Sequence, residues 1–136
     1  MATLRAHIVL PAHLAGAAPP AVLLDTTVLI DTLWNRNQRR QLLAGLVVSG
    51  RALAVSALSI AEVYSDRLLV NLNWIPVSRT IAERAGRLEE AFRSQGETRS
   101  IAAMIVAATA LKNGCMVATD NHKDFQILGL TFAALP

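Results

Sequence analysis

The stretch AVLLDTTVLIDTLW, residues 21–34, decides the fold that we expect for this chain. Its first four residues are apolar and are followed by Asp25, a pattern typical of a short buried strand with a carboxylate at its carboxyl end. From Thr26 to Trp34 the apolar side chains change to a helical spacing. A buried strand that leads directly into a helix is therefore predicted here.

The same alternation of strand and helix continues along the rest of the chain. Further strands are expected at 51–55, 74–77, 115–119 and 128–135, and further helices at 38–48, around Glu62 with Ser56 or Ser59 as its cap, at 80–95 and at 101–112. The helix at 101–112 is apolar nearly all round and should be buried. Together these elements predict the α/β class, as a three-layer α/β/α sandwich around a mostly parallel sheet.

Length and composition favour one domain, residues 21–136, in a chain of 136 residues that is 53% hydrophobic. The longest nearly apolar stretch, 101–111, is too short to span a bilayer, so no membrane partner is expected. Cys115 is the one cysteine, which excludes an internal disulfide and makes a reducing, cytoplasmic location the default. Residues 1–20 faintly resemble a secretory signal, but polar and proline interruptions favour a loose extension or an extra strand.

Acidic side chains follow three of the predicted strands. Asp25 follows the first strand, Asp120 and Asp124 follow the fourth, and Glu62 lies on the helix after the second. Ligands bind at the carboxyl ends of parallel strands, so these acids should converge. Grouped carboxylates repel one another unless a cation neutralises them, and ligation by oxygen alone favours Mg²⁺ or Mn²⁺.

Each acid also has a purely structural interpretation. Asp25 could only cap the next helix, and Asp31 could be an outer acid of the site or a surface charge. Asp66 could join the cluster but is better explained by pairing with Arg67 or solvent. We assign a set of alternating acidic and basic residues to a solvated helix face: Glu83, Glu89, Glu90 and Glu97 with Arg84, Arg87, Arg93 and Arg99. His122 is expected to be a loop residue without a role in the site.

One hydroxyl has a possible supporting role. Thr119 ends the fourth predicted strand, where it could donate a hydrogen bond to Asp25 and fix the rotamer of that side chain. An ordinary strand threonine explains the spacing equally well.

The motifs in order resemble those of PIN-domain ribonucleases, specifically the VapC-type toxins of toxin-antitoxin pairs. The matching stretches are LLDTTVLIDTL (23–33), SALSIAEVY (56–64) and IVAATALKNGCMVATDNHKDF (105–125). The resemblance implies that Asp25 and Glu62 are catalytic metal ligands and that Thr27 and Thr119 support them. Asn121 and Asp124 fall on the variable fourth position of the family, and either could face the metal.

One departure from the family pattern affects the expected activity. The resemblance implies a third acid four residues before the AATAL run, where this chain has Ala103. The chain therefore lacks one core metal ligand, and Mg²⁺ binding and catalysis should be weakened. A single loss among otherwise intact motifs favours an engineered inactive form over a natural member with weakened catalysis.

The resemblance implies a metal-dependent endoribonuclease that cleaves structured RNA such as tRNA, with a VapB-type antitoxin and a second copy of the chain as partners. A sequence pI near 9.8 is compatible with a polyanionic partner. Four basic residues near the acidic motifs could hold phosphates or could form a solvated basic face: Arg36, Arg39, Arg40 and Lys123. The alternative function is a non-catalytic PIN-like module that binds a protein or RNA.

Overall fold

A computed structural model describes residues 20–63 and 72–135 of the chain. The strands are β1 (Val22–Leu24), β2 (Leu53–Ser56), β3 (Asn73–Ile75) and β4 (Met116–Ala118). The helices are α1 (Thr26–Leu33), α2 (Arg39–Val48), α3 (Ala57–Glu62), α5 (Arg79–Ser94), α6 (Ile101–Asn113) and the 3-10 helix η2 (His122–Phe125). Each of these elements lies within about two residues of a predicted one, except η2, which the sequence did not predict.

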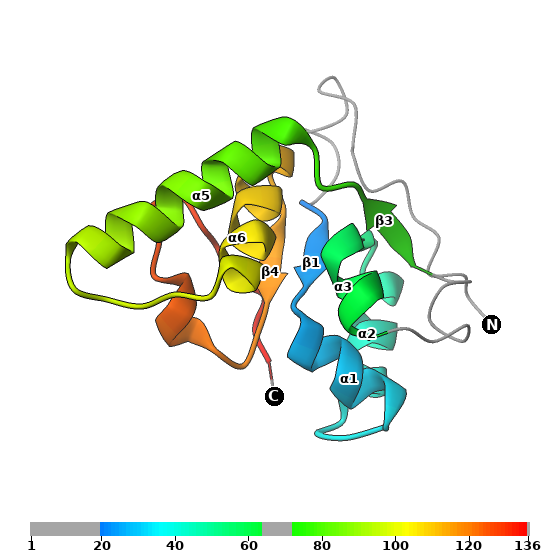
Figure 1. Ribbon diagram of the computed structural model, residues 1–136. Helices are drawn as coiled ribbons and strands as arrows, with labels where there is room; N and C mark the ends of the chain where they lie inside the picture. Colours follow the sequence, from blue (N-terminus) through cyan, green and yellow to red (C-terminus); the bar gives the residue numbers. More distant parts are fainter. Residues whose placement is uncertain (1–19, 64–71, 136) are drawn as a thin grey trace.

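The described strands form one parallel sheet in the order β3-β2-β1-β4. Leu23 of β1 is in register with Ala54 of β2 on one side and with Val117 of β4 on the other. Because β1 lies between β2 and β4, the carboxyl ends of these three strands meet at one edge of the sheet (Figure 1).

Alternate residues of each strand pack on opposite faces of the sheet. Leu23 packs into a cluster with side chains of α5 and α6, whereas its neighbours Val22 and Leu24 pack into a second cluster with side chains of α1 and α2. Figure 1 shows the two groups of helices on either side of β1 and β4. The predicted three-layer α/β/α sandwich with a parallel sheet is confirmed.

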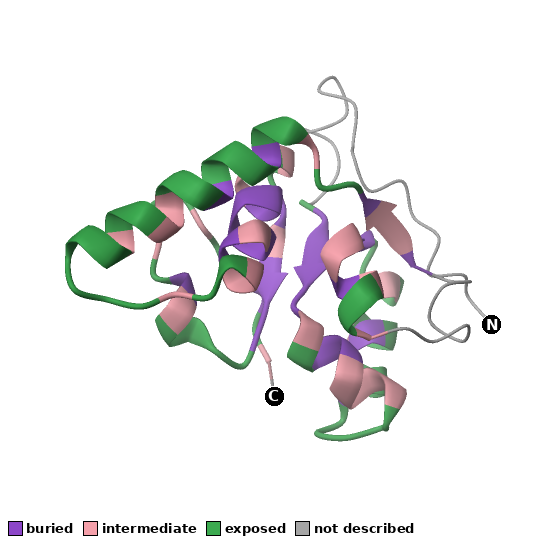
Figure 2. Ribbon diagram, viewed as in Figure 1, coloured by how far each residue is buried: buried purple, intermediate pink, exposed green. Residues whose placement is uncertain are grey.

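Burial follows the predicted helix patterns. On α5, Ile81 and Ala85 are buried and the charged residues face outward, whereas α6 is buried along most of its length (Figure 2). Gly114 ends α6 with a positive φ of 64°, a left-handed conformation that glycine adopts without a steric penalty. Cys115 follows as a core side chain, and burial raises the pKa of its thiol to about 11.

The predicted fifth strand at 128–135 is wrong for the described structure. Residues 122–130 form η2 and a turn, so that only a short segment reaches the edge of β4. That segment makes one isolated parallel bridge, between Phe132 and Val117, with two backbone hydrogen bonds of 2.9 Å. The predicted extension at 1–20, except Pro20, and Asp66 lie outside the described residues.

In the described part of the chain, the search for a helix with the length and apolar character needed to cross a bilayer found none.

Candidate active site

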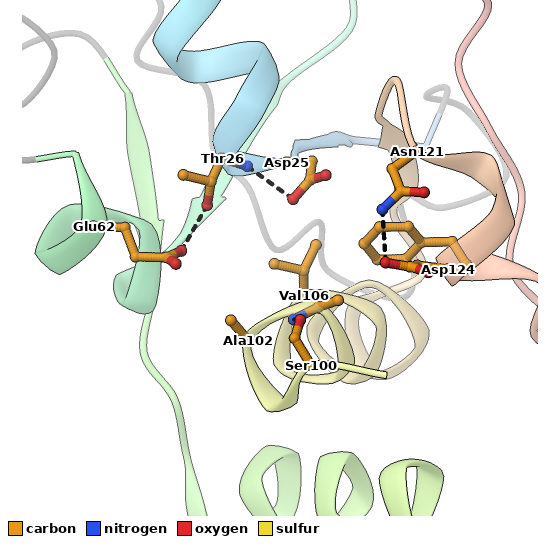
Figure 3. A pocket seen from close by; sticks show the side chains of 10 residues that line it. Asp25, Thr26, Glu62, Ser100, Ala102, Val106, Asn121 and Asp124 are labelled. Atoms are coloured by element: carbon orange, nitrogen blue, oxygen red, sulfur yellow. Dashed lines mark hydrogen bonds between the residues drawn. The ribbon is translucent and has the colours of Figure 1, made fainter. Parts of the chain in front are cut away.

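A cavity of about 150 Å³ lies at the edge of the sheet where β1, β2 and β4 end. Side chains from four parts of the chain point into it (Figure 3). The lining residues are Asp25, Thr26, Glu62, Ser100, Ala102, Ala103, Val106, Asn121, Asp124 and Phe125. The structure therefore brings the predicted acids Asp25, Glu62 and Asp124 to one pocket.

Asp25 is the most buried of these acids, with 9% of its surface exposed. It precedes α1 and accepts a hydrogen bond from the Thr26 backbone N–H at 2.8 Å, so it does cap the helix. It also lines the pocket, so the two interpretations of this residue are compatible. Burial raises the pKa of the Asp25 carboxyl above its usual value, and the negative charges of Glu62 and Asp120 add to the shift.

Thr119 holds the second carboxylate oxygen of Asp25. Its hydroxyl donates to Oδ2 of Asp25 at 2.8 Å and accepts a hydrogen bond from the Asn121 backbone N–H at 2.9 Å. Thr119 is fully buried, so its hydrogen bond to Asp25 is shielded from bulk water. The hydrogen bond from Thr119 to Asp25 that the sequence suggested is present, and it opposes the effect of burial on the Asp25 pKa.

Glu62 is the last residue of α3 and is exposed, with its carboxylate directed toward the start of α1 (Figure 3). The Thr26 hydroxyl donates to Oε1 of Glu62 at 2.7 Å, and the Ser59 hydroxyl lies 3.0 Å from the Thr26 oxygen. Because the Thr26 proton is used on Glu62, Ser59 is the donor to Thr26. A chain of two hydroxyls thus orients Glu62.

Asn121 and Asp124, the two alternatives for the fourth position, both line the pocket. The Asn121 side-chain amide donates to Oδ2 of Asp124 at 2.6 Å. Phe125, which follows, is buried and anchors η2 to the core beneath the pocket. The pair therefore reaches the pocket as one hydrogen-bonded unit.

Arg99 contacts the same unit from the start of α6. Its Nε lies 3.7 Å from Oδ1 of Asp124, and its Nη2 lies 3.1 Å from Oε1 of Glu97. Its guanidinium carbon lies 4.4 Å from the centre of the Phe92 ring. The side chain of Arg99 is only 7% exposed, so its assignment to a solvated helix face was wrong.

Ala103 lies in the first turn of α6 and lines the pocket. Its backbone N–H donates to the Ser100 hydroxyl at 3.0 Å, which is the N-terminal cap of this helix. The position at which the resemblance implies an acid thus borders the same space as Asp25, Glu62 and Asp124. In this chain a methyl group occupies that position.

The basic residues proposed for RNA differ in their positions. Arg36, Arg40 and Lys123 are exposed, and Arg40 donates to the last carbonyl groups of α1, those of Thr32 and Leu33. Arg39 is only 3% exposed, and its guanidinium pairs with Asp120 at 2.5 Å. The assignment of Arg39 to a phosphate-binding surface is therefore corrected, because its side chain is buried and its guanidinium is bonded to Asp120.

Two predicted supporting residues lie away from the pocket. Thr27 is exposed, and Asp31, at the far end of α1, accepts a hydrogen bond from the Asn37 side chain. The sequence analysis missed the pocket roles of Thr26, Ser59, Ser100 and Arg99. The role of Thr26 could have been predicted, because Thr26 directly follows the helix cap Asp25 and so lies beside it. The contact of Arg99 with Asp124 could not, because it depends on how η2 packs.

The donors present are of the type that a hard divalent cation prefers, namely carboxylate and amide oxygens. Their arrangement is incomplete, since no group of three or more His, Cys, Asp or Glu side chains in the described part of the chain is placed to hold a metal ion. The gap coincides with Ala103 and with the pairing of Asp124 to Arg99. The pocket therefore has the kinds of oxygen ligand that a divalent cation prefers, but too few of them are placed to hold one.

Comparisons with known proteins give matches among solved structures. No protein-family model matches the chain, and no curated protein matches it significantly. The structure is similar to VapBC2 from Rickettsia felis bound to a DNA fragment from their promoter, with a TM-score of 0.72, 17% identity, and coverage of 85% of this chain and 99% of that one. It is also similar to a toxin-antitoxin complex from Klebsiella pneumoniae, with a TM-score of 0.66, 25% identity, and coverage of 83% of this chain and 97% of that one. A third similar structure is VapBC-1 from nontypeable Haemophilus influenzae, with a TM-score of 0.69, 21% identity, and coverage of 83% of this chain and 96% of that one.

These neighbours confirm the resemblance at the level of the fold. The chain has the fold of a VapC-type PIN domain, and the alignment spans nearly the whole of each neighbouring chain.

Proposed function

We propose that this chain is the toxin of a toxin-antitoxin pair, with a PIN-type endoribonuclease site whose activity is weak or absent because Ala103 replaces one acid. The observation that carries the proposal is the pocket itself. Asp25, Glu62 and Asp124 arrive from three separate segments and line one cavity together with Ala103. The similarity to toxin-antitoxin complexes supports this interpretation of the fold.

The proposed cofactor is Mg²⁺, with Mn²⁺ as a substitute, bound more weakly than a complete ligand set would bind it. Asp25 and Glu62 would hold the ion, with Asp124 or Asn121 on the other side of the pocket. A bound divalent cation supplies an activated water and offsets charge on a phosphodiester. Thr119 and Thr26 hold the two nearest carboxylates in fixed orientations, so these side chains do not have to be ordered when the ion binds.

The proposed partners are a VapB-type antitoxin, an RNA substrate and a second copy of the chain. The antitoxin proposal rests on the neighbours, which are toxin-antitoxin complexes. For RNA, the exposed side chains of Arg36, Arg40 and Lys123 provide positive charge for phosphate groups. We place the protein in the cytoplasm, where RNA and a reduced Cys115 are both expected.

Restoring the acid tests the proposed activity. We expect Ala103→Asp to cleave structured RNA in Mg²⁺ at least tenfold faster than the present chain, because even groups that only orient metal ligands contribute about 10–100-fold and a ligand should contribute no less. Ala102→Asp is the matched control, since it adds the same charge to the same pocket one residue away. No gain for Ala103→Asp, or an equal gain for both variants, would contradict the proposal.

A second candidate is a PIN-like module that binds a protein or RNA without catalysis. The pairing of Arg99 with Asp124 favours it, because this ion pair neutralises one acid of the pocket without a metal. Calorimetric titration separates the two functions. The binding module predicts no Mn²⁺ affinity even in Ala103→Asp, with RNA affinity unchanged.

A further inference from the structure

The side chain of Arg99, like that of Arg39, is almost completely enclosed by the described structure. It precedes Ser100, the cap of α6, and its side chain is 7% exposed. A buried guanidinium must be matched by negative charge and hydrogen bonds, because its loss of hydration is costly. What surrounds Arg99 therefore indicates what it does.

Two carboxylates, one ring and one backbone carbonyl surround Arg99, whose Nη1 donates to the Thr98 carbonyl at 3.1 Å. Its Nη2 hydrogen-bonds Glu97 at 3.1 Å, its guanidinium stacks over Phe92, and its Nε lies 3.7 Å from Asp124. Nε is buried and makes no hydrogen bond, so its interaction with Asp124 is charge attraction across 3.7 Å. Glu97 lies outside the pocket lining, whereas Asp124 lies in it.

The two enclosed arginines act on different carboxylates. Arg39 is bonded to Asp120, which does not line the pocket, so this pair has a structural role. Arg99 is paired with the one acid that the loop after β4 contributes to the pocket lining. A cation that entered the pocket would have to share Asp124 with a guanidinium that is already there.

We propose that Arg99 is a positioning residue that competes with a divalent cation for Asp124 and so lowers the metal affinity of the pocket. This inference rests on the proposed function, because it concerns the same metal. Low affinity then has two separate causes, the missing acid at Ala103 and the charge of Arg99. Restoring the acid alone leaves Asp124 turned toward Arg99, and affinity recovers only in part.

Calorimetric titration with MnCl₂ tests this inference on the full chain. We expect Ala103→Asp/Arg99→Gln to bind Mn²⁺ about tenfold more tightly than Ala103→Asp, which is the size of effect typical of residues that orient metal ligands. Arg99→Lys in the same background is the matched control, because it keeps the positive charge and should leave the affinity close to that of Ala103→Asp. A thermal melt of each variant confirms that it is folded.

A cycle with Asp124→Asn provides a second measurement that does not rely on a large gain. In the Ala103→Asp background this substitution should change Mn²⁺ affinity little, and in the background that also carries Arg99→Gln it should weaken binding about tenfold. Equal losses in the two backgrounds would overturn the inference and leave the proposed function intact. Absence of Mn²⁺ binding in every variant would overturn both.

Discussion

The two sides of the pocket hold their carboxylates by different means. On the hydroxyl side, formed by Asp25 and Glu62, the partners are the side chains of threonine and serine and one backbone N–H. On the arginine side, Asp124 lines the pocket and Asp120 lies outside its lining, and their charged partners are Arg99 and Arg39, respectively. One side therefore keeps its negative charge, whereas the other is neutralised within the protein.

This difference shows that converging acids do not by themselves make a metal site. The sequence argument was that grouped carboxylates need a cation, and on the arginine side the chain supplies that cation itself. On the hydroxyl side no cation is present within the described contacts, and the raised pKa of Asp25 reflects burial with Glu62 and Asp120 nearby. The negative charge that remains for a metal lies with Asp25 and Glu62.

The largest effect on stability is expected from the arginine side. Arg39→Met keeps the buried stem but removes the guanidinium that bonds Asp120 and the Asn37 carbonyl, which should cost about 3 kcal/mol because hydrogen bonds from a charged group contribute about 1.5–3 kcal/mol. Arg40→Met is the control, because Arg40 is exposed and should cost about 0.5 kcal/mol. Urea denaturation measures both, and equal losses would mean that the Arg39 pair contributes no more than a surface contact.

The next effect is expected on the hydroxyl side. Thr119→Val removes the donor to Asp25 and the acceptor for Asn121 at a fully buried position, which should cost about 2 kcal/mol. Thr109→Val is the control, since the Thr109 hydroxyl is equally buried but only bonds the carbonyl of Ile105 in its own helix. If the two variants melt alike, the contact with Asp25 does not stabilise the fold.

A smaller effect is expected at the outer end of the hydroxyl side. Thr26→Val breaks the bonds to Glu62 and Ser59 and should cost about 1 kcal/mol, because Thr26 is only partly buried. Thr27→Val makes the same change at the exposed neighbour and should stay within about 0.5 kcal/mol of the native chain. Indistinguishable urea midpoints would remove the distinction that the structure draws between the two threonines.

The finest test is a pH profile of Asp25→Asn. The pKa of Asp25 is raised in the folded state, so its contribution to stability is complete below the unfolded value near 3.8 and is lost as pH rises through the raised pKa. The asparagine variant lacks this loss, and its stability relative to the native chain should increase with pH across that window. Urea unfolding at several pH values measures the difference, and a flat or falling difference would contradict the burial argument.

Much of the fold could be predicted from the sequence because the strands and helices differ in period. Residues 21–34 already show the change from a buried strand to a helix, and the apolar run at 101–112 forms the buried helix α6. The prediction of a strand at 128–135 was wrong because apolar residues there, such as Leu130 and Phe132, pack against the core while only one isolated bridge forms with β4. The spacing of apolar residues along the sequence predicts which side chains are buried, but it does not predict which backbone segments form hydrogen-bonded strands.

The acids of the site could be predicted for a topological reason, and their partners could not. Asp25 and Asp124 follow strands that end at one edge of the sheet, which follows from a parallel arrangement alone. The pairing of Arg99 with Asp124 depends on the packing of η2 against the start of α6, and no spacing along the chain encodes it. For the same reason Arg39 could not be told apart from its exposed neighbour Arg40.

The most direct test of whether the pocket lacks a metal ligand at position 103 is thermal unfolding with and without MnCl₂. The native chain is compared with Ala103→Asp. A metal that binds only the folded state stabilises it in proportion to the logarithm of its affinity. We predict that Mn²⁺ raises the Tm of Ala103→Asp clearly more than that of the native chain. Equal shifts in the two proteins would contradict the account.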